Sequence, residues 1–166
     1  MKILKKNFAN KMLFINYFFA SIISYSGLLI GIFLVQIAPE EQMPLKKYFV
    51  SLSRFLLFMI FIFMFLYYYN KFLYSIILLL LLAFLLFSEF HTRYIFRKVM
   101  FIYFILGIIF LLSPKNFNLF VIESSLILLY GIPTSSSIYN KKGKNFLRIF
   151  YYSFIFIIIA NFLFYL

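Results

Sequence analysis

Residues 13–37 read LFINYFFASIISYSGLLIGIFLVQI and contain no charged side chain. An α-helix rises about 1.5 Å per residue, so a helix of this length crosses the roughly 30 Å hydrocarbon core of a bilayer. Phe and Ile favour strands in water, but a segment in lipid must satisfy its own backbone polar groups, which favours a helix. The stretch is therefore predicted to be a membrane-spanning helix.

Composition extends this prediction to the whole chain. Of its 166 residues, 66% are hydrophobic and only 12% are charged, and the mean hydropathy is +1.04. A soluble domain of this length needs more polar side chains to cover its surface. There is no cysteine and only one histidine, His91, which excludes disulfides, thiol catalysis and a multi-histidine zinc site. We predict no metal site and no cofactor.

Five further apolar runs are long enough to be spans. We predict an all-α, polytopic transmembrane helix bundle of about six spans, forming a single integral membrane domain over residues 1–166. The predicted spans are 13–37, 48–69, 72–88, 94–112, 116–133 and 148–166. The apolar runs show no alternation of polar and apolar residues, as a membrane barrel would.

The segments between the runs are short. Residues 1–12, MKILKKNFANKM, place apolar residues at helical spacing between lysines, which indicates a basic interfacial helix. Residues 38–47 and 134–147 are the longest polar connections, and we expect both to be loops. No segment is long enough for a soluble domain.

The basic residues predict a topology in the cell membrane. The formal net charge is +12, with 16 Lys and Arg that cluster at the ends of the apolar runs, where they meet anionic lipid headgroups. We therefore expect lipid as the partner and no nucleic acid. Ten of these 16 residues fall on one side, eight of them within 38–47, 89–98 and 134–147 and the others being Arg54 and Arg148, which favours cytoplasmic placement of these loops. The basic N-terminal flank argues for the reverse orientation.

Glu123 lies inside the apolar segment LFVIESSLILLYGIP. An ionisable group at membrane depth costs several kcal/mol and normally faces the bundle interior or water. Helical spacing places it on one stripe with three other polar residues, and the four form a predicted intramembrane polar centre of Asn116, Glu123, Tyr130 and Thr134. The alternative is that Glu123 lies near the interface and reaches water along its side chain. We expect Gly131 and Pro133 to break this helix.

Small residues form a stripe on the first predicted span. Ala20, Ser24, Gly27 and Gly31 follow helical spacing, and the two glycines form a GxxxG pattern. Small side chains let two helices approach closely. The stripe is predicted to be a helix-packing face, either within the bundle or between protomers of a homo-oligomer.

A second polar group ends the third predicted span. Glu89, Arg93 and Arg97 follow at steps of four, with His91 beside them. Arg binds phosphate through two parallel hydrogen bonds, so these residues are candidates for an interfacial headgroup site. The alternative is an ion pair that ends the span.

The sequence contains no P-loop, GxSxG, HExxH or dinucleotide-binding pattern. We hypothesise a small non-catalytic membrane protein, either a permease-like carrier or a membrane subunit that works with a membrane-protein partner, with its polar centre on the fifth span. One alternative is an integral membrane enzyme of lipid metabolism, which would use the headgroup candidates. Another alternative is a non-catalytic membrane scaffold.

Overall fold

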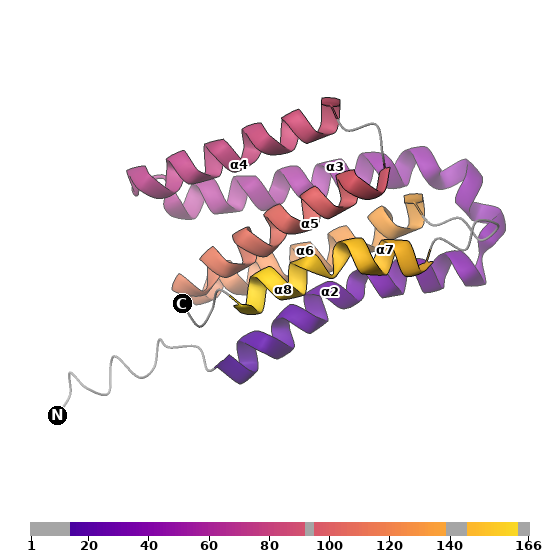
Figure 1. The fold of residues 1–166 in the computed structure, drawn as a ribbon, viewed down its shortest axis with the longest axis horizontal. Coiled ribbons are helices and arrows are strands. Elements are labelled where there is room, and N and C mark those ends of the chain that lie inside the picture. Colours follow the sequence, from indigo (N-terminus) through magenta and orange to yellow (C-terminus); the bar gives the residue numbers. More distant parts are fainter. Residues whose placement is uncertain (1–13, 92–94, 139–145, 163–166) are drawn as a thin grey trace.

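The computed structural model describes residues 14–91, 95–138 and 146–162; within these, the side chains of 39, 41–43, 87–91, 95 and 146 are excluded from the description. All regular structure in the described part is helical (Figure 1), so the predicted all-α helical bundle is confirmed. The elements are α2 (Phe14–Ile37), α3 (Pro39–Tyr68), α4 (Phe72–His91), α5 (Ile95–Leu112), the 3-10 turn η1 (Ser113–Lys115), α6 (Phe117–Ile138), α7 (Phe146–Ser153) and α8 (Ile155–Phe162). The predicted interfacial helix 1–12 lies outside the described residues.

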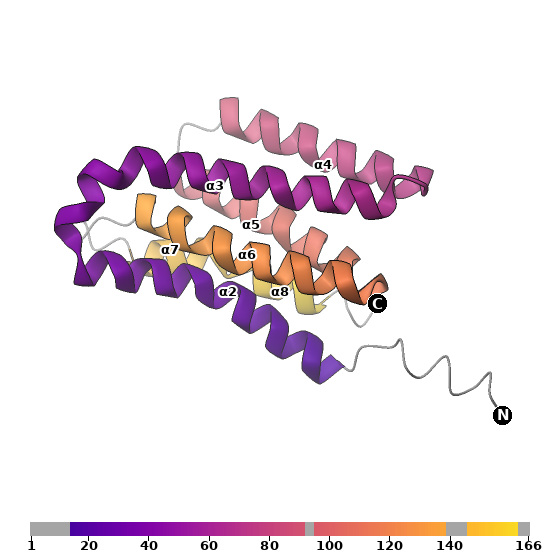
Figure 2. The same ribbon diagram turned by 180° about the vertical axis from the view of Figure 1, so that it is seen from behind.

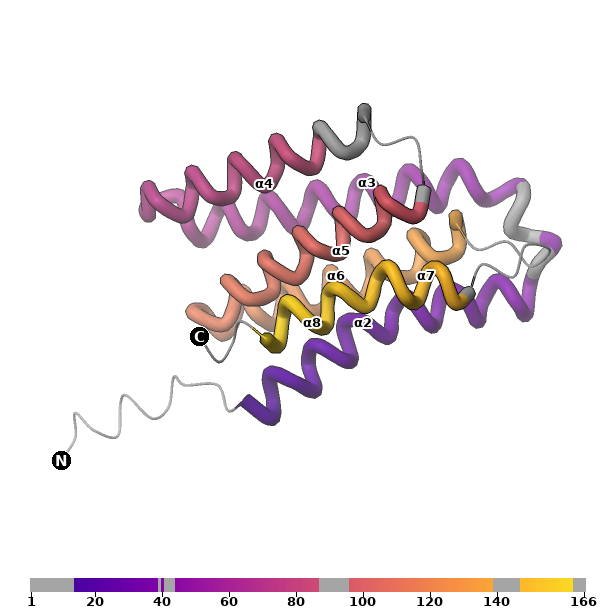
Figure 3. The backbone as a smooth tube through the Cα atoms, viewed as in Figure 1, coloured from indigo at the N-terminus to yellow at the C-terminus, as the bar shows by residue number. Residues whose placement is uncertain are grey.

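The helices lie side by side along one long axis, and each reverses direction relative to the one before it, except that α8 continues in the direction of α7 (Figures 1 and 3). One end of the bundle collects the end of α2, the start of α3, the end of α4, the start of α5, the end of α6 and the start of α7 (Figure 2). We call it the basic end, because Lys46, Lys47, Arg97, Lys98 and Arg148 belong to the helix starts there. The other end is called the opposite end.

Among the described residues, four helical segments are long and apolar enough to cross a membrane: Phe14–Ile37, Pro44–Tyr68, Phe96–Lys115 and Phe117–Ile138. Two shorter apolar segments, Phe72–Leu86 and Leu147–Phe162, occupy the positions of the third and sixth predicted spans. Each predicted apolar run is therefore largely helical within the described residues, and these apolar helices fit a membrane protein.

The prediction that residues 38–47 form a loop is wrong. Helix α3 starts at Pro39 and continues through Pro44 into the apolar run. Proline fits the first turn of a helix, because the N–H that it lacks would have no partner within the helix there. The polar segment therefore extends α3 rather than separating it from α2.

The predicted break in the fifth span is also wrong. Helix α6 continues through Gly131 and Pro133 to Ile138. Pro133 removes one backbone hydrogen bond, but nearby serine hydroxyls bond back to the helix: Ser135 Oγ donates to the Gly131 carbonyl oxygen at 2.9 Å. Packing against α2 holds the same turn, because a Cβ on Gly131 would lie 2.5 Å from the backbone nitrogen of Leu28.

The small-residue stripe of α2 faces α6. A Cβ built on Gly31 would overlap the Ile132 carbonyl oxygen. Ser24 Oγ donates a hydrogen bond to the Ser124 carbonyl oxygen at 3.0 Å, and Ser136 Oγ of α6 lies 3.2 Å from the Gly31 carbonyl oxygen. Ala20 is partly buried and packs against the apolar core. The stripe therefore lies within the bundle.

Aromatic rings fill the core between α2, α5, α6 and α8. The ring of Phe110 lies 5.0 Å from that of Tyr17, 5.2 Å from that of Phe120 and 5.5 Å from that of Phe156. The Tyr17 hydroxyl donates a hydrogen bond to the Ala160 carbonyl oxygen at 2.7 Å. These contacts hold α8 against α2 and α5. A turn at Phe154 separates α8 from α7.

Candidate functional site

A cavity of about 250 Å³ lies between α3, α5 and α6, and its lining includes residues of the basic end. Its lining combines three cations with four hydroxyl-bearing residues and several apolar side chains. The cations are Lys46, Arg54 and Lys98, and the hydroxyls are those of Ser53, Tyr130, Thr134 and Ser137. None of the described residues that line it is acidic. We call it the basic cavity.

Helical periodicity explains how these residues meet. On α3, Lys46, Val50 and Arg54 follow at steps of four and so share one face of the helix. On α6, Tyr130 and Thr134 are related by the same step. Lys98 extends from the first turn of α5, which begins at Ile95. Each helix contributes one stripe, and the basic cavity is the space between the three stripes.

Thr134 is the most informative hydroxyl of the basic cavity. Its side chain is 6% exposed, and its Oγ1 has no hydrogen-bond partner within the described part of the chain. Buried polar groups are nearly always paired, because an unpaired one costs about 1–3 kcal/mol. A ligand in the basic cavity would supply the partner that this hydroxyl lacks.

The electrostatics of the basic cavity select for negative charge. Lys98 is half-buried, whereas Arg54 and Lys46 are exposed to the surroundings of the bundle. A guanidinium binds phosphate or carboxylate in a bidentate manner, and lysine adds a point charge. Three positive charges with hydroxyl donors beside them have the chemistry to bind an anion that also accepts hydrogen bonds.

The predicted polar centre is divided between three places. Tyr130 and Thr134 line the basic cavity. Glu123 is fully buried, and neither carboxyl oxygen has a hydrogen-bond partner among the described residues; it lies about 10 Å from Tyr130 along the helix axis. Asn116 is exposed at the opposite end, where its Oδ1 accepts hydrogen bonds from the backbone N–H groups of Asn118 (3.1 Å) and Leu119 (3.5 Å). Asn116 therefore caps the start of α6.

The headgroup candidates are only partly placed. Glu89 and His91 belong to α4, but their side chains lie outside the description, as does Arg93 altogether. Arg97 is exposed on α5 and is absent from the described lining of the basic cavity. Their convergence on one headgroup site stays a prediction.

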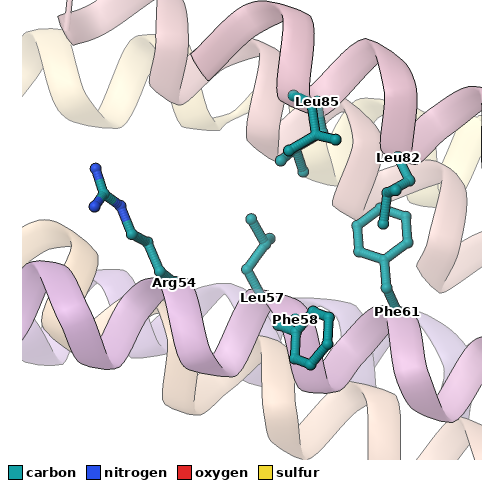
Figure 4. Close-up of a pocket in the computed structure, with 7 residues that line it drawn as sticks. Arg54, Leu57, Phe58, Phe61, Leu82 and Leu85 are labelled. Atoms are coloured by element: carbon teal, nitrogen blue, oxygen red, sulfur yellow. The ribbon is translucent and has the colours of Figure 1, made fainter. Parts of the chain in front are cut away.

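A second hollow adjoins the basic cavity. A groove of about 550 Å³ runs between α3 and α4 and is lined by Arg54 and six apolar side chains, among them Leu57, Phe61 and Leu85. Figure 4 shows Leu82 and Leu85 of α4 above Leu57 and Phe61 of α3, with Arg54 at one end of the row. We call it the apolar groove. Arg54 and Leu57 line both spaces.

Sequence reasoning missed the three cations of the basic cavity, because it assigned Lys46, Arg54 and Lys98 to topology alone. Arg54 did carry a signal, since it is the only charged residue in the predicted span 48–69, and such residues usually mark sites. No family model, no curated protein and no solved structure matches the chain. What the basic cavity binds is therefore argued from its own residues.

Proposed function

We propose that this chain is a multi-pass integral membrane protein that binds an anionic ligand in the basic cavity. The observation that carries the proposal is the convergence of Lys46, Arg54 and Lys98 on the buried hydroxyls of Tyr130 and Thr134. Cations supply attraction, and hydroxyls supply directed hydrogen bonds. A permease-like carrier, or a membrane subunit that presents a ligand to a partner, requires such a site.

The same features argue against a purely structural scaffold. A scaffold gains stability when apolar side chains fill the space between its helices. Here a cavity of about 250 Å³ remains, three positive charges border it, and the Oγ1 of Thr134 lacks a partner among the described residues. The unfilled space and the unpaired hydroxyl each cost free energy, and a ligand bound in the basic cavity offsets both.

Charge also supports an orientation for the proposed spans. The residues that flank the basic cavity belong to the basic end, where cytoplasmic placement accords with the distribution of Lys and Arg. The cytoplasmic leaflet carries anionic lipids, and the cytosol holds phosphorylated metabolites. The basic cavity would therefore face the side of the membrane that is richer in its ligands.

The test uses a water-soluble probe, glycerol 1-phosphate, titrated into the purified chain in a non-ionic detergent by isothermal calorimetry. We expect saturable binding that weakens about ten-fold in Arg54→Gln or Lys98→Gln, because a hydrogen bond to a charged group contributes about 1.5–3 kcal/mol. Raising the salt concentration should weaken it further, since partly exposed charges are screened.

Lys47→Gln is the matched control. Lys47 neighbours Lys46 on α3 and is exposed, but it is absent from the described lining of the basic cavity. Its loss removes the same charge from the same end of the bundle, and binding should change less than about two-fold. Equal losses in Lys47→Gln and Arg54→Gln would mean that only the overall positive charge attracts the anion, which contradicts a defined site.

A further inference from the structure

We infer that the ligand is an anionic phospholipid, with its phosphate headgroup in the basic cavity and one acyl chain in the apolar groove. This inference rests on the proposed anion site and names its ligand class. It is carried by the juxtaposition of two spaces of opposite character, one with three cations and one with a single cation and an otherwise apolar lining.

The two spaces adjoin, because Arg54 and Leu57 line both of them. Along α3 the order is Lys46, then Arg54, then Phe61, so the lining changes from basic to apolar in the direction that leaves the basic end. A phospholipid in the corresponding leaflet has the same order, with its phosphate near the interface and its chains toward the middle of the bilayer.

The apolar groove has the depth and composition that an acyl chain needs. Phe61 (3% exposed), Leu85 (8%) and Leu57 (9%) form its buried floor. Phe58 and Leu86 are exposed and stand at its rim. An acyl chain in the bilayer has already left water, so it enters the groove by close packing against these side chains rather than by hydrophobic free energy.

Size also favours an amphiphile over a small anion. The basic cavity alone, about 250 Å³, lies below the range of about 300–1,000 Å³ for small-molecule sites. Together with the apolar groove of about 550 Å³, it falls within that range. A small soluble anion would leave the apolar groove unused, whereas a phospholipid occupies both spaces.

The chain has no tryptophan, so one introduced tryptophan reports on its own surroundings. Leu86→Trp places an indole at the rim of the apolar groove, and Leu80→Trp places one on the same helix at an exposed position outside the described lining. Each variant is reconstituted in phosphatidylcholine nanodiscs that contain a minor fraction of lipid brominated on its acyl chains. In one sample the brominated lipid is phosphatidylglycerol, and in the other it is phosphatidylcholine. Bromine quenches tryptophan fluorescence on contact.

For Leu86→Trp, we expect brominated phosphatidylglycerol to quench at least about three-fold more than brominated phosphatidylcholine at equal mole fraction, as basic pockets between helices favour anionic lipids. Adding Arg54→Gln should abolish that preference. For Leu80→Trp, the two lipids should quench equally. Quenching by bulk brominated phosphatidylcholine, together with an unchanged far-ultraviolet circular dichroism spectrum, shows that each variant is folded and inserted.

The outcomes separate the two proposals. Equal quenching by both lipids at Leu86→Trp, with Arg54-dependent binding of glycerol 1-phosphate intact, would overturn the lipid inference and leave the anion site standing. If the preference for phosphatidylglycerol and the Arg54-dependent binding of glycerol 1-phosphate were both absent, the anion site would be overturned as well. Equal phosphatidylglycerol preference at Leu86→Trp and Leu80→Trp would mean a general lipid annulus and would also reject the inference.

Discussion

Gly27 of α2 and Leu128 of α6 meet backbone to backbone: a Cβ built on Gly27 would overlap the carbonyl oxygen of Leu128. One α6 turn further along, Gly131 packs in the same way against Leu28. Helices in lipid gain no hydrophobic free energy by associating, so close backbone contact and interhelical hydrogen bonds must hold the pair. This contact positions α6, and with it Tyr130 and Thr134, against the basic cavity.

The first prediction concerns that contact. Gly27→Ala should lower the thermal midpoint of the protein in detergent and reduce its free energy of unfolding by about 1–3 kcal/mol, because the added methyl forces the two backbones apart. Gly107→Ala is the control, since its Cβ would lie no closer than 3.1 Å to any atom of a neighbouring helix, whereas the Cβ of Gly27→Ala would overlap a backbone oxygen. Melting followed by far-ultraviolet circular dichroism measures both. A smaller loss for Gly27→Ala than for Gly107→Ala would contradict the packing.

A second prediction separates a ligand-binding hydroxyl from a structural one. Thr134→Val should leave stability unchanged or raise it, because the Oγ1 that it removes has no partner among the described residues, while it weakens glycerol 1-phosphate binding. Ser136→Ala should lower stability and leave glycerol 1-phosphate binding unchanged. Ser136 Oγ donates to the Ile132 carbonyl oxygen at 2.8 Å and lies 3.2 Å from the carbonyl oxygen of Gly31. Calorimetry measures ligand binding by both variants, and thermal melting measures their stability. If both variants changed binding and stability in the same way, the distinction between the two hydroxyls would be refuted.

The third prediction tests Glu123. Glu123→Leu should stabilise the bundle by about 1–3 kcal/mol, because an apolar side chain replaces a buried carboxyl group that lacks partners among the described residues. Glu123→Gln keeps the shape and a polar group, so its melting midpoint should stay close to that of the parent. Because Glu123 lies about 10 Å from Tyr130 along α6, neither variant should change glycerol 1-phosphate binding by more than about two-fold. A large loss of binding in Glu123→Gln would contradict this and join Glu123 to the basic cavity.

The fourth prediction concerns topology. The chain has no cysteine, so single-cysteine variants can be labelled cleanly. Lys71→Cys and Asn118→Cys, exposed at the opposite end, should react with a membrane-impermeant maleimide in intact cells. Lys47→Cys and Leu147→Cys at the basic end should react only after the membrane is opened. Reversed reactivity would correct the orientation alone, whereas reaction of Lys47→Cys and Lys71→Cys from the same side would refute the arrangement of spans.

Hydropathy predicted the helices well, because continuous apolar runs leave the backbone no alternative in lipid. Helix ends were harder. Pro39 was interpreted as a loop residue, although it starts α3, and Pro133 was expected to stop a helix that packing against α2 keeps intact. At the site, the polar stripe of α6 indicated Tyr130 and Thr134, but the cations come from α3 and α5. Which helices surround the stripe depends on tertiary packing, which one sequence does not reveal.

The pairing of α2 with α6 has a consequence for biosynthesis. Ser24 and Ser124, which hydrogen-bond across this pair, are 100 residues apart, and Tyr17 and Ala160 are 143 apart. The ribosome therefore synthesises α2 long before α6 exists. Until α6 follows, the small-residue stripe of α2 lacks the helix against which it packs. Contacts between segments this far apart in sequence form only after both have been made, so the pairing of α2 with α6 is a late step of folding.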